Sequence, residues 1–254
     1  MTRRQLAALF ASATLPASSA EPPQRSLYEL RFIRLRNGPE NQRQRTTAFL
    51  KTYVALAKSA GAGPIGLFSS SVGEGAPYLV VLTSFRDYAG MGAARQKLAA
   101  DPDYAKARAE LEKGGPPFER QEVNLLLAFP GYPAITPPPT EGRKTSRLFE
   151  LRMYELENFT HLERKIRMFD EGETAIFIRA GMLPVFFGET LAGSNLPSLW
   201  YMLGFDDLAA RESTGRVSGA DPAWKTLGAQ YPDVATVPKL SISFLTPLAF
   251  SDIR

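Results

Sequence analysis

Two short stretches of the sequence place a carboxylate and a guanidinium two residues apart. Glu29 is followed by Arg31, and Glu150 is followed by Arg152. Residues i and i+2 of a β-strand point to the same face of a sheet, so the members of each pair share a face. If that face lines a partly desolvated cavity, the arginine can hold the carboxylate or enolate of a ligand through its planar fork. The alternative is a structural ion pair that fixes the register of two packed sheets.

Four apolar or aromatic side chains are candidates for the wall of the same cavity: Tyr154, Phe186, Trp200 and Met202. Ligand pockets commonly combine such a lining with a few polar groups. In this interpretation Arg152 and Glu150 orient a small molecule, while Tyr154 and Trp200 stack on it. The alternative is that the four side chains simply pack the core between two sheets.

The composition excludes several kinds of chemistry. The chain has no cysteine and one histidine, which excludes disulfides, thiolate metal sites, a cysteine nucleophile and a cluster of several histidines. His161 falls in the first turn of a predicted helix, where we expect it to face solvent. The glycine-rich stretch 73–77 lacks the Lys-Ser/Thr pair of a phosphate-binding loop. We therefore predict no metal and no cofactor and name no catalytic residue. A haem- or metal-linked protein stays as a weaker alternative.

The elements that must position these residues occur twice. YELRFIRL at 28–35 and FELRMYEL at 149–156 share four of eight positions, and an Asp-Pro pair recurs 120 residues later. A register kept over most of the chain indicates a tandem duplication, with repeats at 27–129 and 148–250. The segment 130–147 between the repeats is rich in proline. We expect it to be an extended, semi-rigid spacer that contributes nothing to a core.

The residue pattern of each repeat predicts a strand, a helix, two strands, a helical region and a final strand, in that order. The helical region should break at its Asp-Pro pair, because the residue before a proline avoids helical geometry. The order β-α-β-β-α-β describes a ferredoxin-like unit. In the second repeat, Thr160 and Glu163 fit a capping box at the start of the first helix. A charged cluster around the start of the next helical region should form a solvated face: Asp206, Asp207, Arg211 and Glu212.

A ferredoxin-like unit covers only one face of its sheet with helices. Trp200 and Met202 should occupy the uncovered face in the second repeat, and Val80 and Leu82 should do so in the first. Burial of such faces against each other stabilises by several kcal/mol, at roughly 25 cal/mol per Å² of apolar area. The sequence thus predicts an α+β protein with two tandem ferredoxin-like domains, of the dimeric α/β-barrel type, packed sheet to sheet.

Residues 1–20 differ from the rest of the chain. Two arginines precede a short apolar run, and small residues follow up to Ala20, which is the order of a cleavable export signal. The Arg3-Arg4 pair resembles the twin-arginine type of signal. The alternative is a disordered basic tail. We expect a periplasmic or secreted protein after cleavage, and a cytoplasmic one if the segment is not a signal. The run is too short to span a bilayer, which takes about 20 apolar residues, so no stable membrane insertion is expected.

Several stretches of the second repeat resemble the NIPSNAP family: ELRMYEL, LPVFFGETLAG, LWYMLGFDDLAARE and LSISFLTPLAF. The first repeat keeps YELRFI and SFRDY but lacks the tryptophans, so it resembles a diverged copy. The resemblance implies the dimeric α+β barrel fold, which small monooxygenases and other ligand-holding enzymes share. It implies little about activity.

The leading hypothesis is a NIPSNAP-like protein that binds a small apolar or aromatic molecule inside the barrel, with any chemistry independent of a cofactor. The predicted ligand-binding residues are Glu29, Arg31, Glu150, Arg152, Tyr154, Phe186, Trp200 and Met202. The alternative is a non-catalytic interaction or structural module whose barrel is filled by its own side chains. A cavity of a few hundred Å³ would favour the first hypothesis. The net charge of +4 is scattered, so we expect no nucleic-acid partner, and a small molecule and further copies of the chain are the expected partners.

Overall fold

The computed structural model of the protein describes residues 23–143 and 145–254, so the predicted export signal at 1–20 lies outside the described residues. The elements of the first half are β1 (Leu27–Arg34), α1 (Gln42–Ser59), β2 (Ile65–Val72), β3 (Tyr78–Phe85), α2 (Tyr88–Ala100), α3 (Pro102–Glu112) and β4 (Arg120–Ala128). Those of the second half are β5 (Leu148–Glu155), α4 (Phe159–Met168), the π-helical turn η1 (Phe169–Glu173), α5 (Thr174–Arg179), β6 (Leu183–Ala192), β7 (Ser198–Phe205), α6 (Leu208–Gly219), α7 (Ala223–Gln230) and β8 (Lys239–Pro247).

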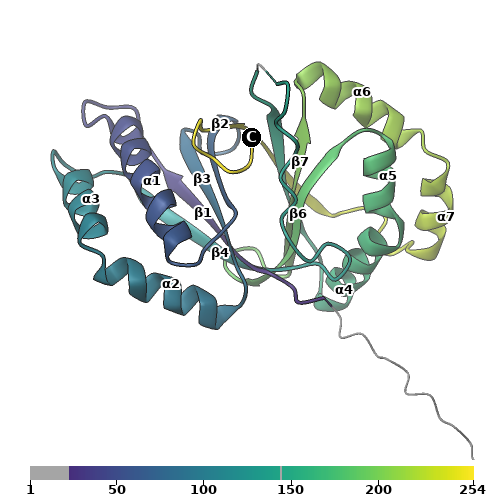
Figure 1. Ribbon diagram of the computed structural model, residues 1–254. Helices are drawn as coiled ribbons and strands as arrows, with labels where there is room; N and C mark the ends of the chain where they lie inside the picture. The colour runs from purple at the N-terminus through teal and green to yellow at the C-terminus, as the bar shows by residue number, and fades with distance from the viewer. Residues whose placement is uncertain (1–22, 144) are drawn as a thin grey trace, which may run out of the picture.

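The eight strands form one closed antiparallel barrel (Figure 1). Each half contributes four strands in the ferredoxin-like order, β4-β1-β3-β2 in the first half and β8-β5-β7-β6 in the second. The two sheets join edge to edge where β2 pairs with β8 and where β4 pairs with β6. The predicted fold class and the duplication are thereby confirmed. Closure also means that every strand edge is paired, which removes the free edges on which sheets aggregate.

The inside of the barrel is filled by side chains from both halves. Phe68 packs edge-on against Phe149 at 5.2 Å between ring centroids, and Tyr28 packs against Phe186 at 5.6 Å. Val80, Leu82 and Met202 are fully buried in the same cluster, as predicted for the face that helices do not cover. The apolar inner surface of one half is therefore shielded from water by that of the other.

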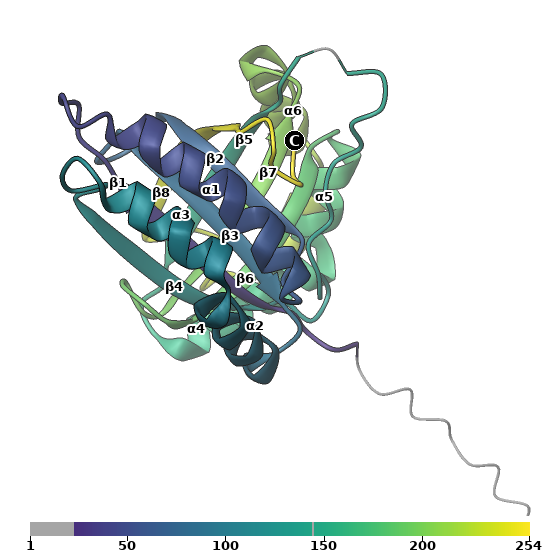
Figure 2. The same ribbon diagram turned by 60° about the vertical axis from the view of Figure 1, so that its left-hand side comes forward.

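The helices lie on the outside of the barrel, α1 to α3 against the first sheet and α4 to α7 against the second (Figure 1 and, turned, Figure 2). Helix α1 turns Leu50, Tyr53, Val54 and Ala57 towards its sheet, at the three- and four-residue spacing of an amphipathic helix. The predicted break at each Asp-Pro pair is confirmed, because α2 ends at Ala100 and Pro102 opens α3. Each half thus encloses a second, outer core between its sheet and its helices.

Two local predictions are wrong. The first helix of the second half is capped by Asn158, whose Oδ1 accepts a hydrogen bond from the His161 backbone N–H at 2.8 Å, and not by Thr160. The segment between the repeats also contributes to the core, because Ile135 lies in the barrel cluster and the Thr136 N–H donates to the Val185 carbonyl. Together with Ile253 at the C-terminus, Ile135 closes the end of the barrel where β1 and β5 begin.

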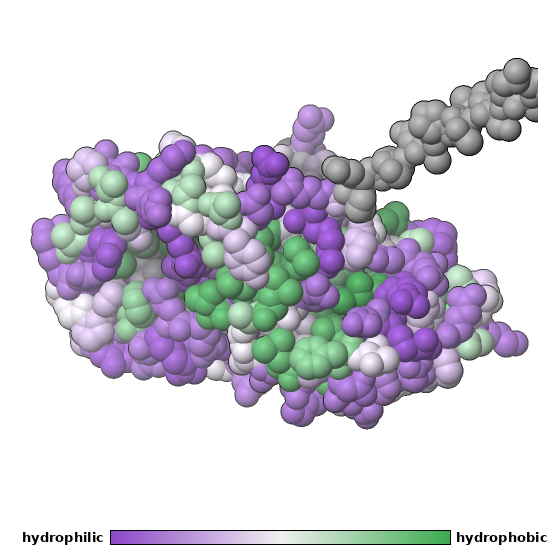
Figure 3. All heavy atoms as spheres, turned by 90° about the horizontal axis from the view of Figure 1, so that it is seen from below, coloured by the Kyte–Doolittle hydropathy of each residue, from purple (hydrophilic) through white to green (hydrophobic). Residues whose placement is uncertain are grey.

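The face of the molecule seen from below in Figure 3 carries an apolar patch between polar surroundings. Among the apolar residues of β4 and β6, Val123 and Leu191 are partly exposed. Within the described parts of the chain, no helix has both the length and the apolar character that crossing a bilayer demands.

The C-terminal closure can be tested by replacing Ile253 with alanine. The side chain is fully buried, and its backbone is anchored because Ser251 accepts from the Leu67 N–H at 2.9 Å and Asp252 accepts from the Ile65 N–H at 2.9 Å. We expect Ile253→Ala to lower the free energy of unfolding by about 2–4 kcal/mol, since the truncation leaves a cavity. Urea unfolding measures this change. The matched control is Arg254→Ala, whose exposed side chain should make little difference, and equal stabilities of the two variants would contradict the closure.

Candidate functional site

The predicted site residues do not form one wall, because they lie on opposite faces of the sheets. Phe186 and Met202 are buried inside the barrel, and Trp200 packs at the edge of the same cluster. Glu150, Arg152 and Tyr154 alternate with the inward residues Phe149, Leu151 and Met153 along β5 and therefore face the helices. Glu29 and Arg31 likewise face the helices of the first half. The expectation that the charged pairs share a cavity with Phe186, Trp200 and Met202 is wrong, whereas Tyr154 does lie on the same side as Glu150 and Arg152. A strand turns successive side chains to opposite faces, and the inner face is the apolar one.

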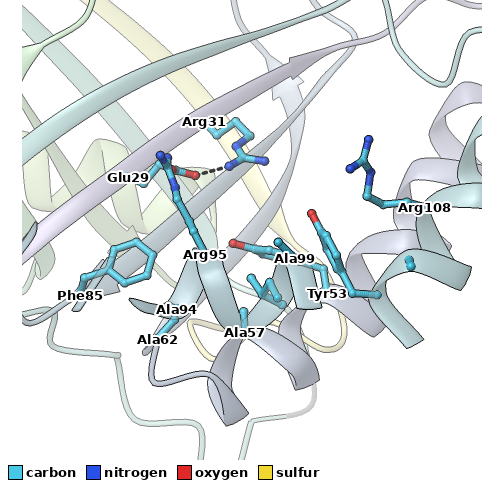
Figure 4. Close-up of a pocket in the computed structure, with 13 residues that line it drawn as sticks. Glu29, Arg31, Tyr53, Ala57, Ala62, Phe85, Ala94, Arg95, Ala99 and Arg108 are labelled. Atoms are coloured by element: carbon cyan, nitrogen blue, oxygen red, sulfur yellow. Dashed lines mark hydrogen bonds and ion pairs between the residues drawn. The ribbon is translucent and has the colours of Figure 1, made fainter. Parts of the chain in front are cut away.

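A cavity of about 350 Å³ lies between the first sheet and its helices (Figure 4). We call it the helix-side pocket. Its polar lining comes from β1, α1, α2 and α3 and consists of Glu29, Arg31, Tyr53, Arg95, Tyr104 and Arg108. The remaining lining is small or apolar and consists of Ala57, Ala62, Phe85, Ala94, Leu98, Ala99 and Ala105. The run of alanines on three helices keeps the helices close while leaving space against the sheet.

Glu29 is the centre of the charges in the helix-side pocket. Its side chain is 2% exposed, and its two carboxylate oxygens accept separate hydrogen bonds from Arg31 and Arg95. Arg31 is one-quarter exposed, and its Nε is buried without an acceptor within the described residues. Three arginines against one carboxylate leave the lining with a surplus of positive charge. The pocket therefore favours an anion with an apolar body.

Electrostatics fix the protonation states of two groups in the pocket. Burial lowers the pKa of Arg31, but the neighbouring Glu29 carboxylate outweighs this and the net pKa lies above its ordinary value. Burial raises the pKa of the Tyr53 phenol, an effect that the Arg31 charge only partly offsets. At neutral pH Arg31 is thus a permanent cation and Tyr53 a neutral phenol that can donate a hydrogen bond.

The second half repeats the carboxylate with two arginines. Glu150 is fully buried and accepts from Arg152 Nε at 2.5 Å and from Arg211 Nε at 2.7 Å. Burial raises the pKa of Glu150, but the hydrogen bond from Arg211 and the charge of Arg152 outweigh it and hold the pKa below its usual value. In each half, then, one arginine comes from the strand of the carboxylate and the other from the helix that follows the third strand.

Sequence reasoning missed both helix arginines. Arg211 was expected on a solvated face, yet its side chain is 29% exposed and pairs with a buried carboxylate. Arg95 was not singled out, because it lies one helical turn further from its N-cap than Arg211 and so breaks the register of the duplication. The available signal was that the helix after the third strand of each half contains an arginine, Arg95 in α2 and Arg211 in α6. His161, expected to face solvent, lies on α4 beside Glu157 and Asp233, away from the pocket.

Large aromatic side chains fill the corresponding space in the second half. The positions 120 residues after Leu67, Ala57 and Val81 hold Phe187, Phe177 and Tyr201. Tyr201 stacks on Phe187 at 5.5 Å and on Phe177 at 6.1 Å between ring centroids. Three larger residues thus pack the layer between sheet and helices in the second half, where Phe177 takes the place of the pocket-lining Ala57.

Polar groups are still buried within this filled space. The Tyr201 hydroxyl accepts from Arg152 at 3.1 Å and shares a short hydrogen bond with Tyr154. Nearby, Lys165 and Glu173 form a fully buried pair at 2.7 Å, where η1 interrupts the helix. Burial raises the pKa of Glu173, although Lys165 opposes the rise. These groups satisfy each other. A cavity of about 460 Å³ opens beside Arg152 and Arg211, and its other lining residues are Met182, Phe205, Glu212, Gly215 and Arg216.

The helix-side pocket is suited to holding and orienting a small anion. Its lining contains no histidine, cysteine or methionine, and its one carboxylate is occupied by two arginines. No cluster of three metal-binding side chains occurs among the described residues. The donor set therefore does not fit a haem held by an axial histidine, and we derive no step through such a group.

A family model described as NIPSNAP matches the chain twice, at residues 28–131 and at residues 149–252. The chain belongs to the NIPSNAP family. The two matches coincide with the two halves of the barrel, so one chain carries two NIPSNAP units that close on each other. No curated protein sequence matches the chain.

Solved structures similar to this NIPSNAP protein share its fold over nearly the whole chain. A "putative monooxygenase" from Lactobacillus acidophilus NCFM has a TM-score of 0.59 at 13% identity, covering 88% of this chain and 94% of that one. Another, from Fusobacterium nucleatum subsp. nucleatum ATCC 25586, has a TM-score of 0.56 at 10% identity, covering 89% and 94%. An anthrone oxidase-like protein has a TM-score of 0.52 at 12% identity, covering 89% and 93%. At such identities the likeness shows the fold alone.

The buried carboxylate of the second NIPSNAP unit has a testable pH dependence. Replacing Glu150 with glutamine should lower the free energy of unfolding at neutral pH by about 3 kcal/mol, because two arginines lose their buried counter-charge. The folded-state pKa of Glu150 is depressed, so its contribution is present above the unfolded-state pKa and is lost as the pH falls through the folded-state pKa. The difference in stability between wild type and Glu150→Gln should therefore shrink below about pH 4.

Urea unfolding at a series of pH values measures this difference. The matched control is Glu110→Gln, which removes an exposed carboxylate paired with Lys113 and should leave stability nearly unchanged. A stability difference between wild type and Glu150→Gln that stays constant as the pH falls below about 4 would show that Glu150 is not stabilised as a carboxylate.

Proposed function

We propose that the protein binds a small organic acid with an apolar or aromatic body in the helix-side pocket of its first half. The observation that carries this proposal is the difference between the two halves. Both keep a buried glutamate with two arginines and a cavity beside them. The cavity of the first half is lined mainly by alanines and other apolar side chains, whereas that of the second half is lined mainly by charged ones. A purely structural ion pair does not require such an apolar lining.

The geometry assigns a role to each part of the lining. Arg31 is held by Glu29, so its guanidinium is oriented before a ligand arrives and loses little freedom on binding. Its unpaired Nε and the exposed part of Arg95 are the donors for a ligand carboxylate or enolate. The alanines and Leu98 contact the apolar body of the ligand, and Tyr53 supplies a neutral hydroxyl.

Two further functions remain candidates on specific observations. Cofactor-independent turnover of the bound acid is favoured by the protonated Tyr53 phenol beside Arg31, which could hydrogen-bond a developing enolate. A non-catalytic interaction module is favoured by the packed barrel interior and by the aromatic filling of the second half. The first predicts consumption of a bound acid, and the second predicts that no acid binds.

The proposal is tested by titrating 2-naphthoate into the protein by isothermal calorimetry. Arg31→Ala should weaken binding by about 10- to 100-fold, because it removes a charge-assisted hydrogen bond. Ala57→Phe should abolish binding, since it fills the pocket as Phe177 fills the equivalent place in the second half.

The matched control is Ala93→Phe, which makes the same change on the exposed face of α2 and should leave affinity unaltered. Thermal melting of each variant verifies that it is folded. Unchanged naphthoate affinity in a folded Ala57→Phe variant would rule out the helix-side pocket. Failure of a panel of aryl and alkyl acids to bind the wild type would favour the interaction module.

A further inference from the structure

The open end of the barrel contains a second cavity that shares no residue with the helix-side pocket. We define the barrel mouth as this cavity, which lies where β1 and β5 end and has a volume of about 640 Å³. The opposite end is closed by Ile135 and Ile253. Residues of both halves line the barrel mouth, so it exists only because the barrel closes.

Aromatic and apolar side chains form the inner surface of the barrel mouth. Trp200 packs against Phe32 at 5.5 Å between ring centroids, and Phe32 packs against Tyr78 at 5.7 Å. Leu151 and Met153 of β5 complete this surface. Such a lining suits a flat, apolar ring system.

The charged groups at the rim of the barrel mouth neutralise each other. Arg34 donates to Glu122 at 2.8 and 3.0 Å and to the Glu74 carbonyl at 3.0 Å, and its guanidinium lies 4.8 Å from the centroid of the Tyr78 ring. Arg120 donates to the other oxygen of Glu122 at 2.6 Å. Two arginines and two glutamates line the cavity, so it offers no surplus charge to an ionic ligand. This differs from the positive helix-side pocket.

One polar group of the barrel mouth lacks a partner. The indole Nε1 of Trp200 is shielded from solvent and has no acceptor within the described residues. The other tryptophan of the chain, Trp224, is satisfied, because its Nε1 donates to the Ser218 carbonyl at 2.7 Å. The Tyr78 hydroxyl at the barrel mouth is also satisfied, since it donates to Ser243 at 2.8 Å. Buried donors in proteins normally have acceptors.

We propose that the barrel mouth binds an uncharged, planar aromatic molecule whose carbonyl oxygen accepts a hydrogen bond from Trp200 Nε1. The ring system lies against Phe32, Tyr78 and Trp200, and the neutral rim disfavours charged analogues, which must lose their hydration without gaining a counter-ion. The site is separate from the proposed acid pocket in both its residues and the charge of its ligand. The proposed ligand lies inside the barrel, at the end that side chains leave open.

The test uses three probes on one naphthalene scaffold: 2-acetylnaphthalene, 2-ethylnaphthalene and 2-naphthoate. The first has the carbonyl acceptor, the second has the same shape without it, and the third is charged. In protein with ¹⁵N-labelled tryptophan, the two indole N–H signals belong to Trp200 and Trp224, and Trp200→Phe assigns them. We expect 2-acetylnaphthalene to move the Trp200 signal downfield and to leave the Trp224 signal in place.

Calorimetry adds the affinities. We expect 2-acetylnaphthalene to bind about tenfold more tightly than 2-ethylnaphthalene, and this preference to disappear in Trp200→Phe, which keeps an aromatic ring without the donor. Equal affinities in the wild type, or binding that leaves the Trp200 signal unmoved, would overturn the proposal even if Trp200→Phe does not fold.

The variant that fills the helix-side pocket separates this proposal from the proposed function. Ala57→Phe should abolish binding of 2-naphthoate and leave binding of 2-acetylnaphthalene unchanged. Loss of 2-acetylnaphthalene binding in that variant would place the ketone in the helix-side pocket and would overturn the barrel-mouth site alone. Loss of 2-naphthoate binding alone, with 2-acetylnaphthalene still bound, would support the barrel-mouth site.

Discussion

The structure depends on mutual burial of the two apolar sheet faces that helices leave uncovered. Each half alone would expose Phe68 or Phe149, Val80 or Met202 to water, and neither half has other elements to cover them. Closing the sheets edge to edge buries these side chains and pairs all strand edges at once. The packed part of the inner face, away from the barrel mouth, then has no room for charged groups, because an unpaired charge in an apolar interior is far costlier than one beside the helices. The location of the Glu-Leu-Arg pairs follows from this constraint.

Both halves solve the problem of a buried glutamate in the same way, with one strand arginine and one helix arginine. The arginines come from different turns of their helices, Arg95 in the first half and Arg211 in the second, so the interaction is kept while the residue position is not. A requirement for charge balance can be met by any side chain long enough to reach, which explains why the duplication drifts here and not at the Asp-Pro pairs.

The same duplicated space has two different uses. Tyr201, Phe177 and Phe187 turn the second half into a stacked aromatic core that includes buried polar groups. In the first half, Ala57 lines a cavity whose surface is mostly small or apolar, whereas the cavity of the second half is lined mostly by charged side chains. The two copies therefore differ in the ligand that they suit, a difference that a duplication permits because each copy is free to change once the barrel is closed.

The sequence by itself determined the duplication, the order of elements in each half and the residues that face the barrel interior, such as Met202 and Val80. These follow from local periodicity and from a register repeated along the chain, so they need no knowledge of distant contacts. It did not determine that Asn158 rather than Thr160 caps α4, because the backbone conformation where the chain enters the helix decides which side chain reaches the free N–H groups. Tertiary structure alone decided that Ile135 joins the barrel core, that Arg95 and Arg211 reach buried glutamates, and that Trp200 lies apart from Arg152. The physical reason is that alternation along a strand assigns residues to two faces but does not say which distant residues each face contacts. Those contacts are fixed only when the barrel closes.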